Sequence, residues 1–138
     1  MPRHLTESLV ALVASGVLIA CATTNATMNA GANRAAIDSA DKFVGTWKVD
    51  LRPTPAAPAY YQEFVVNAVN GKSFTGTFYG APITQGRINT DWGALRFAFV
   101  TSDQSGPYNH SGVLRNNRIE GMTNATGRDF LAYWSAER

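Results

Sequence analysis

Apolar and polar residues alternate along the stretch from Phe43 to Leu51, and this alternation constrains the fold more than any other feature. Phe43, Trp47 and Val49 fall on one side of an extended backbone, while Lys48 falls on the other. A period of two residues is typical of a β-strand with one buried and one solvated face. The pattern recurs in later segments of the chain, so we expect an all-β domain over residues 43–138.

Turn-forming residues divide the rest of this domain into further strands. Asn70-Gly71 is a strong hairpin signal. Prolines exclude a strand from residues 52–58, which we expect to form a loop and potential lid, and Ser102 to Pro107 is a second expected loop. The eight expected strands are 43–51, 60–69, 73–79, 83–89, 95–99, 108–114, 118–124 and 130–138. Short connections between eight antiparallel strands predict an up-and-down β-barrel.

The interior of a barrel of this size is either filled by side chains or holds one small ligand, and the sequence leaves both alternatives open. Segments 70–76 and 115–121 share a turn, an apolar residue and then a glycine. Gly76 and Gly121 are expected to face inward, where a missing side chain lets the strand coil or a neighbour lie against its backbone. The aromatic residues expected to face inward are Trp47, Phe74, Phe78, Phe97, Phe99, Tyr108, Phe130 and Trp134.

Residues 1–20 have the form of an export signal, with Arg3 ahead of an uncharged apolar run that is too short to span a ~30 Å hydrocarbon core. The run ends in Leu18-Ile19-Ala20-Cys21, which resembles the lipobox of bacterial lipoproteins. The resemblance implies that Cys21 carries a diacylglycerol and an acylated amine, which together hold a protein stably on a membrane. The alternative is an ordinary secretory signal that happens to include a cysteine.

Two further observations bear on the anchor. Cys21 is the only cysteine of the chain, so no internal disulfide can form. Ala22 follows it, which resembles the pattern that passes enterobacterial lipoproteins to the outer membrane. We therefore expect a location in the bacterial cell envelope, on the outer membrane and facing the periplasm.

Residues 21–42 are expected to connect the anchor to the barrel. Ala22 to Asn33 has no apolar periodicity and is typical of a disordered tether. Residues 34–42 are expected to form either a short helix or a frayed extension of that tether.

The first strand also carries a family resemblance. Gly45-Thr46-Trp47 resembles the Gly-x-Trp signature of the lipocalin, or calycin, barrels. In that family an arginine near the end of the barrel packs over the tryptophan and closes the base. The resemblance implies a lipocalin-like barrel in which Arg138 stacks on Trp47, with Arg128 as the alternative partner.

The sequence offers little for catalysis, so we expect neither an enzyme nor a bound cofactor. His110 is the only histidine after the expected signal, and one histidine does not make a zinc site, so we expect no metal. A Gly-x-Ser-x-Gly elbow and a phosphate-binding loop are both missing from the sequence. The formal net charge of +2 includes no basic run, which argues against nucleic acid as a partner.

Two classes of function remain. In the first, a membrane-anchored lipoprotein binds a small apolar or amphipathic ligand at the barrel mouth, through Trp47, Tyr108, His110 and Trp134. In the second, the barrel is filled and the protein is a periplasmic protein-binding module, an inhibitor or an envelope-assembly adaptor. Such a module would use loops 52–59 and 102–107.

Overall fold

The computed structural model describes residues 20–138, with side chains described from Met28 onward except at Asn33 and Ile37. The predicted signal peptide, apart from Ala20, and the side chain of Cys21 lie outside this described part. Within it, no helix is long and apolar enough to cross a membrane.

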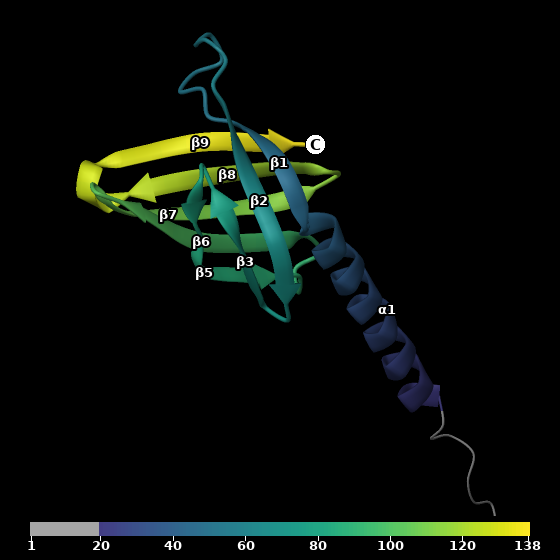
Figure 1. Ribbon diagram of the computed structural model, residues 1–138. Helices are drawn as coiled ribbons and strands as arrows, with labels where there is room; N and C mark the ends of the chain where they lie inside the picture. Colours follow the sequence, from purple (N-terminus) through teal and green to yellow (C-terminus); the bar gives the residue numbers. More distant parts are fainter. Residues whose placement is uncertain (1–19) are drawn as a thin grey trace, which may run out of the picture.

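The domain is a closed antiparallel barrel of eight strands with one short extra strand (Figure 1). Strand β1 pairs with both β2 and β9, and β2 also pairs with β3, which closes the sheet on itself. The prediction of an eight-stranded barrel is therefore confirmed, and β4 is an addition beside β3. The strands are β1 (Gly45–Asp50), β2 (Tyr61–Asn70), β3 (Ser73–Phe78), β4 (Ala81–Pro82), β5 (Thr84–Asn89), β6 (Leu95–Asp103), β7 (Gly106–Arg115), β8 (Arg118–Ala125) and β9 (Phe130–Glu137).

The predicted loop from Ser102 to Pro107 is wrong, because β6 and β7 continue as a long hairpin. Ser102 pairs with Pro107 and Asp103 pairs with Gly106 in the antiparallel ladder. The polar side chains suggested a loop, but ladder hydrogen bonds are made by the backbone and allow polar residues on solvated faces. The extension carries Thr101 and Tyr108 outward to one end of the barrel.

A cluster of aromatic side chains fills the part of the barrel interior next to α1. Phe64 contacts Phe99 with ring centroids 5.3 Å apart, and Phe97 contacts Trp134 at 6.3 Å. Edge-to-face and offset pairs at such distances add to the free energy of burial. The fully buried large side chains are Phe43, Trp47, Val49, Phe64, Val66, Leu95, Phe99, Ile119 and Trp134.

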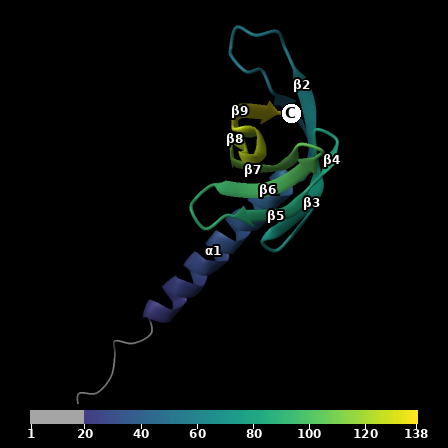
Figure 2. The same ribbon diagram turned by 90° about the vertical axis from the view of Figure 1, so that its left-hand side faces the viewer.

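The helix α1 (Ala20–Phe43) includes Ala22 to Asn33, where a disordered tether was predicted, and residues 34–42, where a short helix was one of the two predicted alternatives. It projects away from one end of the barrel, as two views at right angles show (Figures 1 and 2). The missing apolar periodicity suggested disorder, yet the segment is rich in alanine, the best helix former, and needs no buried face to be helical. Its last residue, Phe43, is fully buried against Phe74 and Phe97, which fixes this end of the helix to the barrel.

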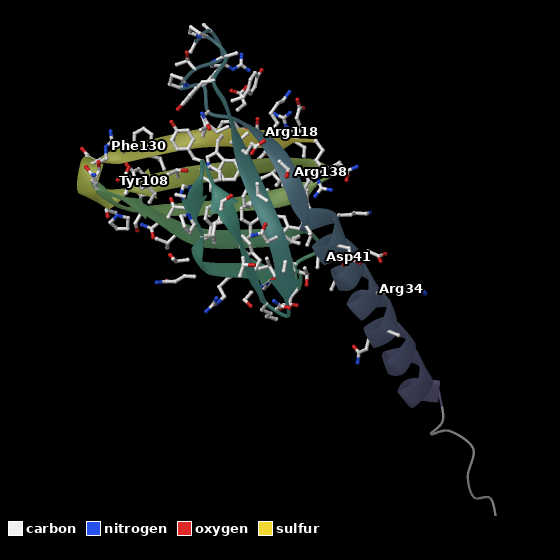
Figure 3. All side chains as sticks on the ribbon, viewed as in Figure 1. Arg34, Asp41, Tyr108, Arg118, Phe130 and Arg138 are labelled. Carbon is white, nitrogen blue, oxygen red and sulfur yellow. The ribbon has the colours of Figure 1, made fainter. Side chains whose placement is uncertain are left out.

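The end of the barrel next to α1 is closed by residues far apart in the sequence. The Arg138 guanidinium lies over the Trp47 ring, 4.1 Å from its centroid, which confirms the predicted stacking. The Trp47 indole donates a hydrogen bond to the Phe43 carbonyl at 2.9 Å. Figure 3 shows Arg138 beside this junction, with Tyr108 and Phe130 at the opposite end.

The loop between β1 and β2 stands out beyond the barrel (Figure 2). Its residues Pro53 and Pro55 line a hollow on the outer surface together with Arg118 and Tyr133. Arg52 forms an ion pair with Asp50 at the start of the loop. The predicted lid therefore does not cover the barrel mouth in this structure.

Candidate functional site

A cavity of about 550 Å³ lies at the end of the barrel opposite α1. It is open to solvent and is lined by the ends of several strands and by the short 3-10 helix η1 (Thr126–Arg128). This volume is within the range of protein sites for small molecules. The lining residues are Leu51, Tyr60, Phe78, Tyr79, Ala81, Thr101, Ser102, Asp103, Tyr108, His110, Thr123, Arg128, Phe130 and Ala132.

The strand register brings polar side chains together on the cavity wall. His110 pairs with Phe99 of β6 on one side and with Thr123 of β8 on the other. Inward-facing residues of neighbouring strands at the same level lie side by side. Thr101, two residues beyond Phe99, is therefore one step nearer the mouth.

His110 is hydrogen-bonded through both ring nitrogens. Its Nε2 lies 2.9 Å from Thr101 Oγ1, and its Nδ1 lies 2.8 Å from Thr123 Oγ1. The ring also stacks on Phe99, with centroids 4.4 Å apart, and contacts Phe78 at 4.6 Å. The histidine is thus held in one orientation by hydroxyl groups on two sides and an aromatic ring on its face.

The environment of His110 keeps its imidazole neutral. Burial lowers the pKa of His110 from 6.5 to about 4, because a charged ring would lose its hydration. No carboxylate is hydrogen-bonded to the ring among the described residues. At neutral pH the site therefore presents an uncharged hydrogen-bonding group next to apolar rings.

Three charged or polar side chains form a network at one side of the mouth. Tyr108 donates its hydroxyl to Asp103 at 3.0 Å, and Arg128 donates to the Tyr108 oxygen at 2.8 Å. The backbone N–H of Ser105 bonds Asp103 and lowers the pKa of that carboxyl. The hydrogen bond to Tyr108 raises the pKa of Arg128. The network holds a carboxylate and a guanidinium in fixed positions at the rim.

Two tyrosines occupy the other side of the mouth. The hydroxyls of Tyr60 and Tyr79 are hydrogen-bonded to each other, and their rings meet edge to face at 6.2 Å. That hydrogen bond raises the pKa of Tyr79. Both rings are about half exposed, so they offer aromatic surface to a molecule entering the cavity.

The predicted ligand contacts separate into two groups. Tyr108 and His110 line the cavity. Trp47 lies at the closed end under Arg138, and Trp134 lies in the core, where its indole donates to Thr123 at 3.1 Å. The aromatic cluster thus fills the half of the barrel next to α1, and the hollow is confined to the mouth.

Sequence reasoning did not single out Thr101 or Thr123 as site residues. Thr123 shares the inward face of its strand with Ile119 and Gly121, so the alternation along the strand could have placed it on the inward face. Thr101 was assigned outside the expected strand 95–99, and this hid its inward position. A polar residue on the apolar face of a strand was the available signal.

Among the described side chains, no group of three His, Cys, Asp or Glu residues is arranged to hold a metal ion. Comparisons of the chain with protein-family models, with curated proteins and with solved structures found no match.

Proposed function

We propose that this protein is a membrane-anchored lipoprotein of the bacterial cell envelope whose barrel binds a small apolar or amphipathic molecule at its mouth. The observation that carries the proposal is the cavity of about 550 Å³, with apolar walls and a hydrogen-bonded histidine inside it. Small-molecule sites typically combine mostly apolar walls with a few fixed polar groups. The lipid anchor rests on the resemblance of Leu18 to Cys21 to a lipobox.

The walls favour a ligand with an apolar body. Phe78 and Ala132 lie within the barrel mouth, and Phe130 is 46% exposed at its edge. An exposed aromatic ring that is covered by a ligand contributes roughly 25 cal/mol for each Å² of apolar surface removed from water. The charged pair Asp103 and Arg128 at the rim suits a polar end that stays near solvent.

Native mass spectrometry of protein purified from a bacterial envelope tests the proposal. We expect an additional mass that is lost on denaturation. The variant Ala132→Phe is expected to abolish this mass, because Ala132 lines the cavity and a phenyl ring would occupy it. Ala98→Phe is the matched control, since Ala98 is exposed on the outer face of β6.

A bound mass that is equally abundant in the wild type and Ala132→Phe would contradict binding at the mouth. A folded wild type that carries no additional mass and binds none of the added apolar compounds would also contradict it.

A second candidate function is binding of another envelope protein, and the outer face of β8 and β9 favours it. Leu131 and Tyr133 are 65% and 56% exposed there, and Met122 pairs with Tyr133 across the strands. Contiguous exposed apolar residues are typical of contact surfaces. A photoreactive residue at position 133 would crosslink the partner in cells, whereas the same residue at position 98 would not.

A further inference from the structure

The hydrogen bonds beside the cavity have a direction that follows from their donors. The indole nitrogen of Trp134 can only donate, and it lies 3.1 Å from Thr123 Oγ1. The hydroxyl proton of Thr123 finds an acceptor, among the described residues, at Nδ1 of His110, 2.8 Å away. We therefore assign Thr123 as an acceptor from the tryptophan and a donor to the histidine, which gives its hydroxyl one hydrogen bond of each kind.

The same reasoning fixes the tautomer of His110. A neutral imidazole carries one ring hydrogen, and Nδ1 is already an acceptor. The hydrogen therefore lies on Nε2, which donates to Thr101 Oγ1 at 2.9 Å. With the hydrogen on Nδ1 instead, the Thr123 oxygen would accept from both Trp134 and His110, and its own proton would be left to point toward the cavity, which Thr123 also lines.

Thr101 stands at the end of this series of hydrogen bonds. It is 5% exposed and lines the cavity. Because its oxygen accepts from His110, its own proton is available, and no acceptor for it occurs among residues whose side chains are described. The remaining direction for that proton is the cavity itself.

We propose that Thr101 donates its hydroxyl proton into the cavity and that the site selects apolar molecules carrying a neutral carbonyl oxygen. This inference rests on the proposed ligand-binding function and narrows its ligand class. A carbonyl oxygen accepts the proton and brings no donor of its own that would need a partner. A ketone or ester placed against the rings would therefore satisfy Thr101 and bury its apolar part.

Other head groups fit this wall less well. A carboxylate loses its hydration on entering an apolar cavity, and one neutral hydroxyl donor does not offset that loss. His110 is neutral, and Arg128 is already bonded to Tyr108 beside Asp103. We therefore expect carboxylates to bind more weakly than ketones of the same size.

The test uses three probes with ten carbon atoms each: butyrophenone, butylbenzene and 4-phenylbutyrate. Binding to the purified full-chain protein is followed by the NMR shifts of the His110 ring, which report on this site alone. We expect butyrophenone to bind about threefold to tenfold more tightly than butylbenzene, as one net hydrogen bond implies. The carboxylate is expected to be the weakest of the three.

Thr101→Val removes the donor and keeps the shape of the side chain. It also removes the acceptor of the His110 Nε2 hydrogen, so we expect it to reduce the preference for butyrophenone over butylbenzene, while Thr101→Ser retains that preference in full. Thr75→Val is the matched control, because Thr75 is exposed on β3. The same spectra should show a hydrogen on Nε2 of His110 and none on Nδ1.

Four results would overturn the inference. Equal binding of ketone and hydrocarbon by the wild type, or an unchanged preference in Thr101→Val, would remove the role of Thr101 and leave apolar ligand binding intact. A hydrogen on Nδ1 would reverse the assigned direction. If none of the probes shifted the His110 resonances, both this inference and the mouth as a ligand site would fail.

Discussion

Arg138 covers the ring of Trp47 and at the same time bonds the end of α1. Its Nη2 donates to the carbonyl of Lys42 at 2.9 Å and also to the carbonyl of Val44. Carbonyls at a helix C-terminus lack partners within the helix and carry partial negative charge, so a guanidinium is favourable there. One side chain thereby joins the last strand, the first strand and the helix.

Replacing this arginine should destabilise the barrel. We expect Arg138→Met to lower the free energy of unfolding by about 1–2 kcal/mol, through loss of the cation–π contact and of charged hydrogen bonds to carbonyls. Urea unfolding followed by tryptophan fluorescence would measure the change. Arg115→Met is the matched control, because the Arg115 side chain has no hydrogen bond or ion pair within the described residues. Equal losses in the two variants would contradict a specific closing role.

The buried His110 makes stability depend on pH. Its pKa falls from 6.5 in the unfolded chain to about 4 in the fold, so the unfolded state binds a proton first as the pH drops. Stability is therefore unaffected by His110 above pH 6.5 and decreases as the pH falls from 6.5 towards 4. A shift of this size corresponds to about 3 kcal/mol over the whole interval.

Urea unfolding at several pH values checks this dependence. We expect the wild type to lose stability between pH 6.5 and 4, and His110→Gln to lose much less over the same interval, whatever its stability at neutral pH. The comparison isolates the histidine because the wild type and the variant both carry Asp50 and Asp103, whose lowered pKa values reduce stability in each protein alike as the pH falls through the acidic end of the interval. A variant whose stability fell as steeply as that of the wild type would assign the effect to other groups.

The sequence predicted the barrel well because its strands are half buried. Alternation along β6 and β8 places large apolar residues on one face, and turn residues such as Asn70-Gly71 mark the hairpins. Two features escaped prediction for a common reason. One is the part of α1 before Arg34, where the side chains from Met28 to Ala32 are exposed, and the other is the extension of the β6–β7 hairpin. Both depend on backbone propensity and pairing and leave no hydrophobic pattern.

The candidate site was predicted only in part. The two-residue alternation along β7 correctly placed Tyr108 and His110 on the inward face. It does not say how deep along the barrel axis each inward residue lies. Trp47 and Trp134 share that face and lie in the filled half of the barrel. Depth depends on strand register and on which end α1 closes, and both are properties of the assembled sheet.

Gly76 and Gly121, the glycines of the two repeated segments, were expected to let a neighbouring group lie against their backbone, and the structure confirms this. A Cβ at Gly121 would lie 2.3 Å from Cζ2 of Trp134, and a Cβ at Gly76 would lie 1.9 Å from the carbonyl oxygen of Val65. The missing side chains thus admit a ring in one case and a neighbouring strand in the other.

Adding a methyl group at Gly121 should therefore be costly. Trp134 is fully buried and hydrogen-bonded to Thr123, so its ring cannot move away without disturbing the core. We expect Gly121→Ala to lower the free energy of unfolding by about 1–3 kcal/mol, as overpacking typically does. Gly31→Ala makes the same chemical change on α1, where nothing lies within 4 Å. Thermal unfolding should show this second variant unchanged or slightly more stable.

The proposed anchor predicts how two substitutions near the N-terminus change membrane location. Cys21→Ser removes the sulfur that would carry the diacylglycerol, so we expect it to abolish acyl labelling of the protein, whereas Ala22→Asp should remain labelled. The lipoprotein resemblance further implies that Ala22→Asp moves the protein from the outer to the inner membrane of an enterobacterial host. Separation of the two membranes by density, with immunodetection, would measure the distribution. Acyl label on Cys21→Ser would rule out this anchor, and an unchanged distribution of Ala22→Asp would rule out sorting by that residue.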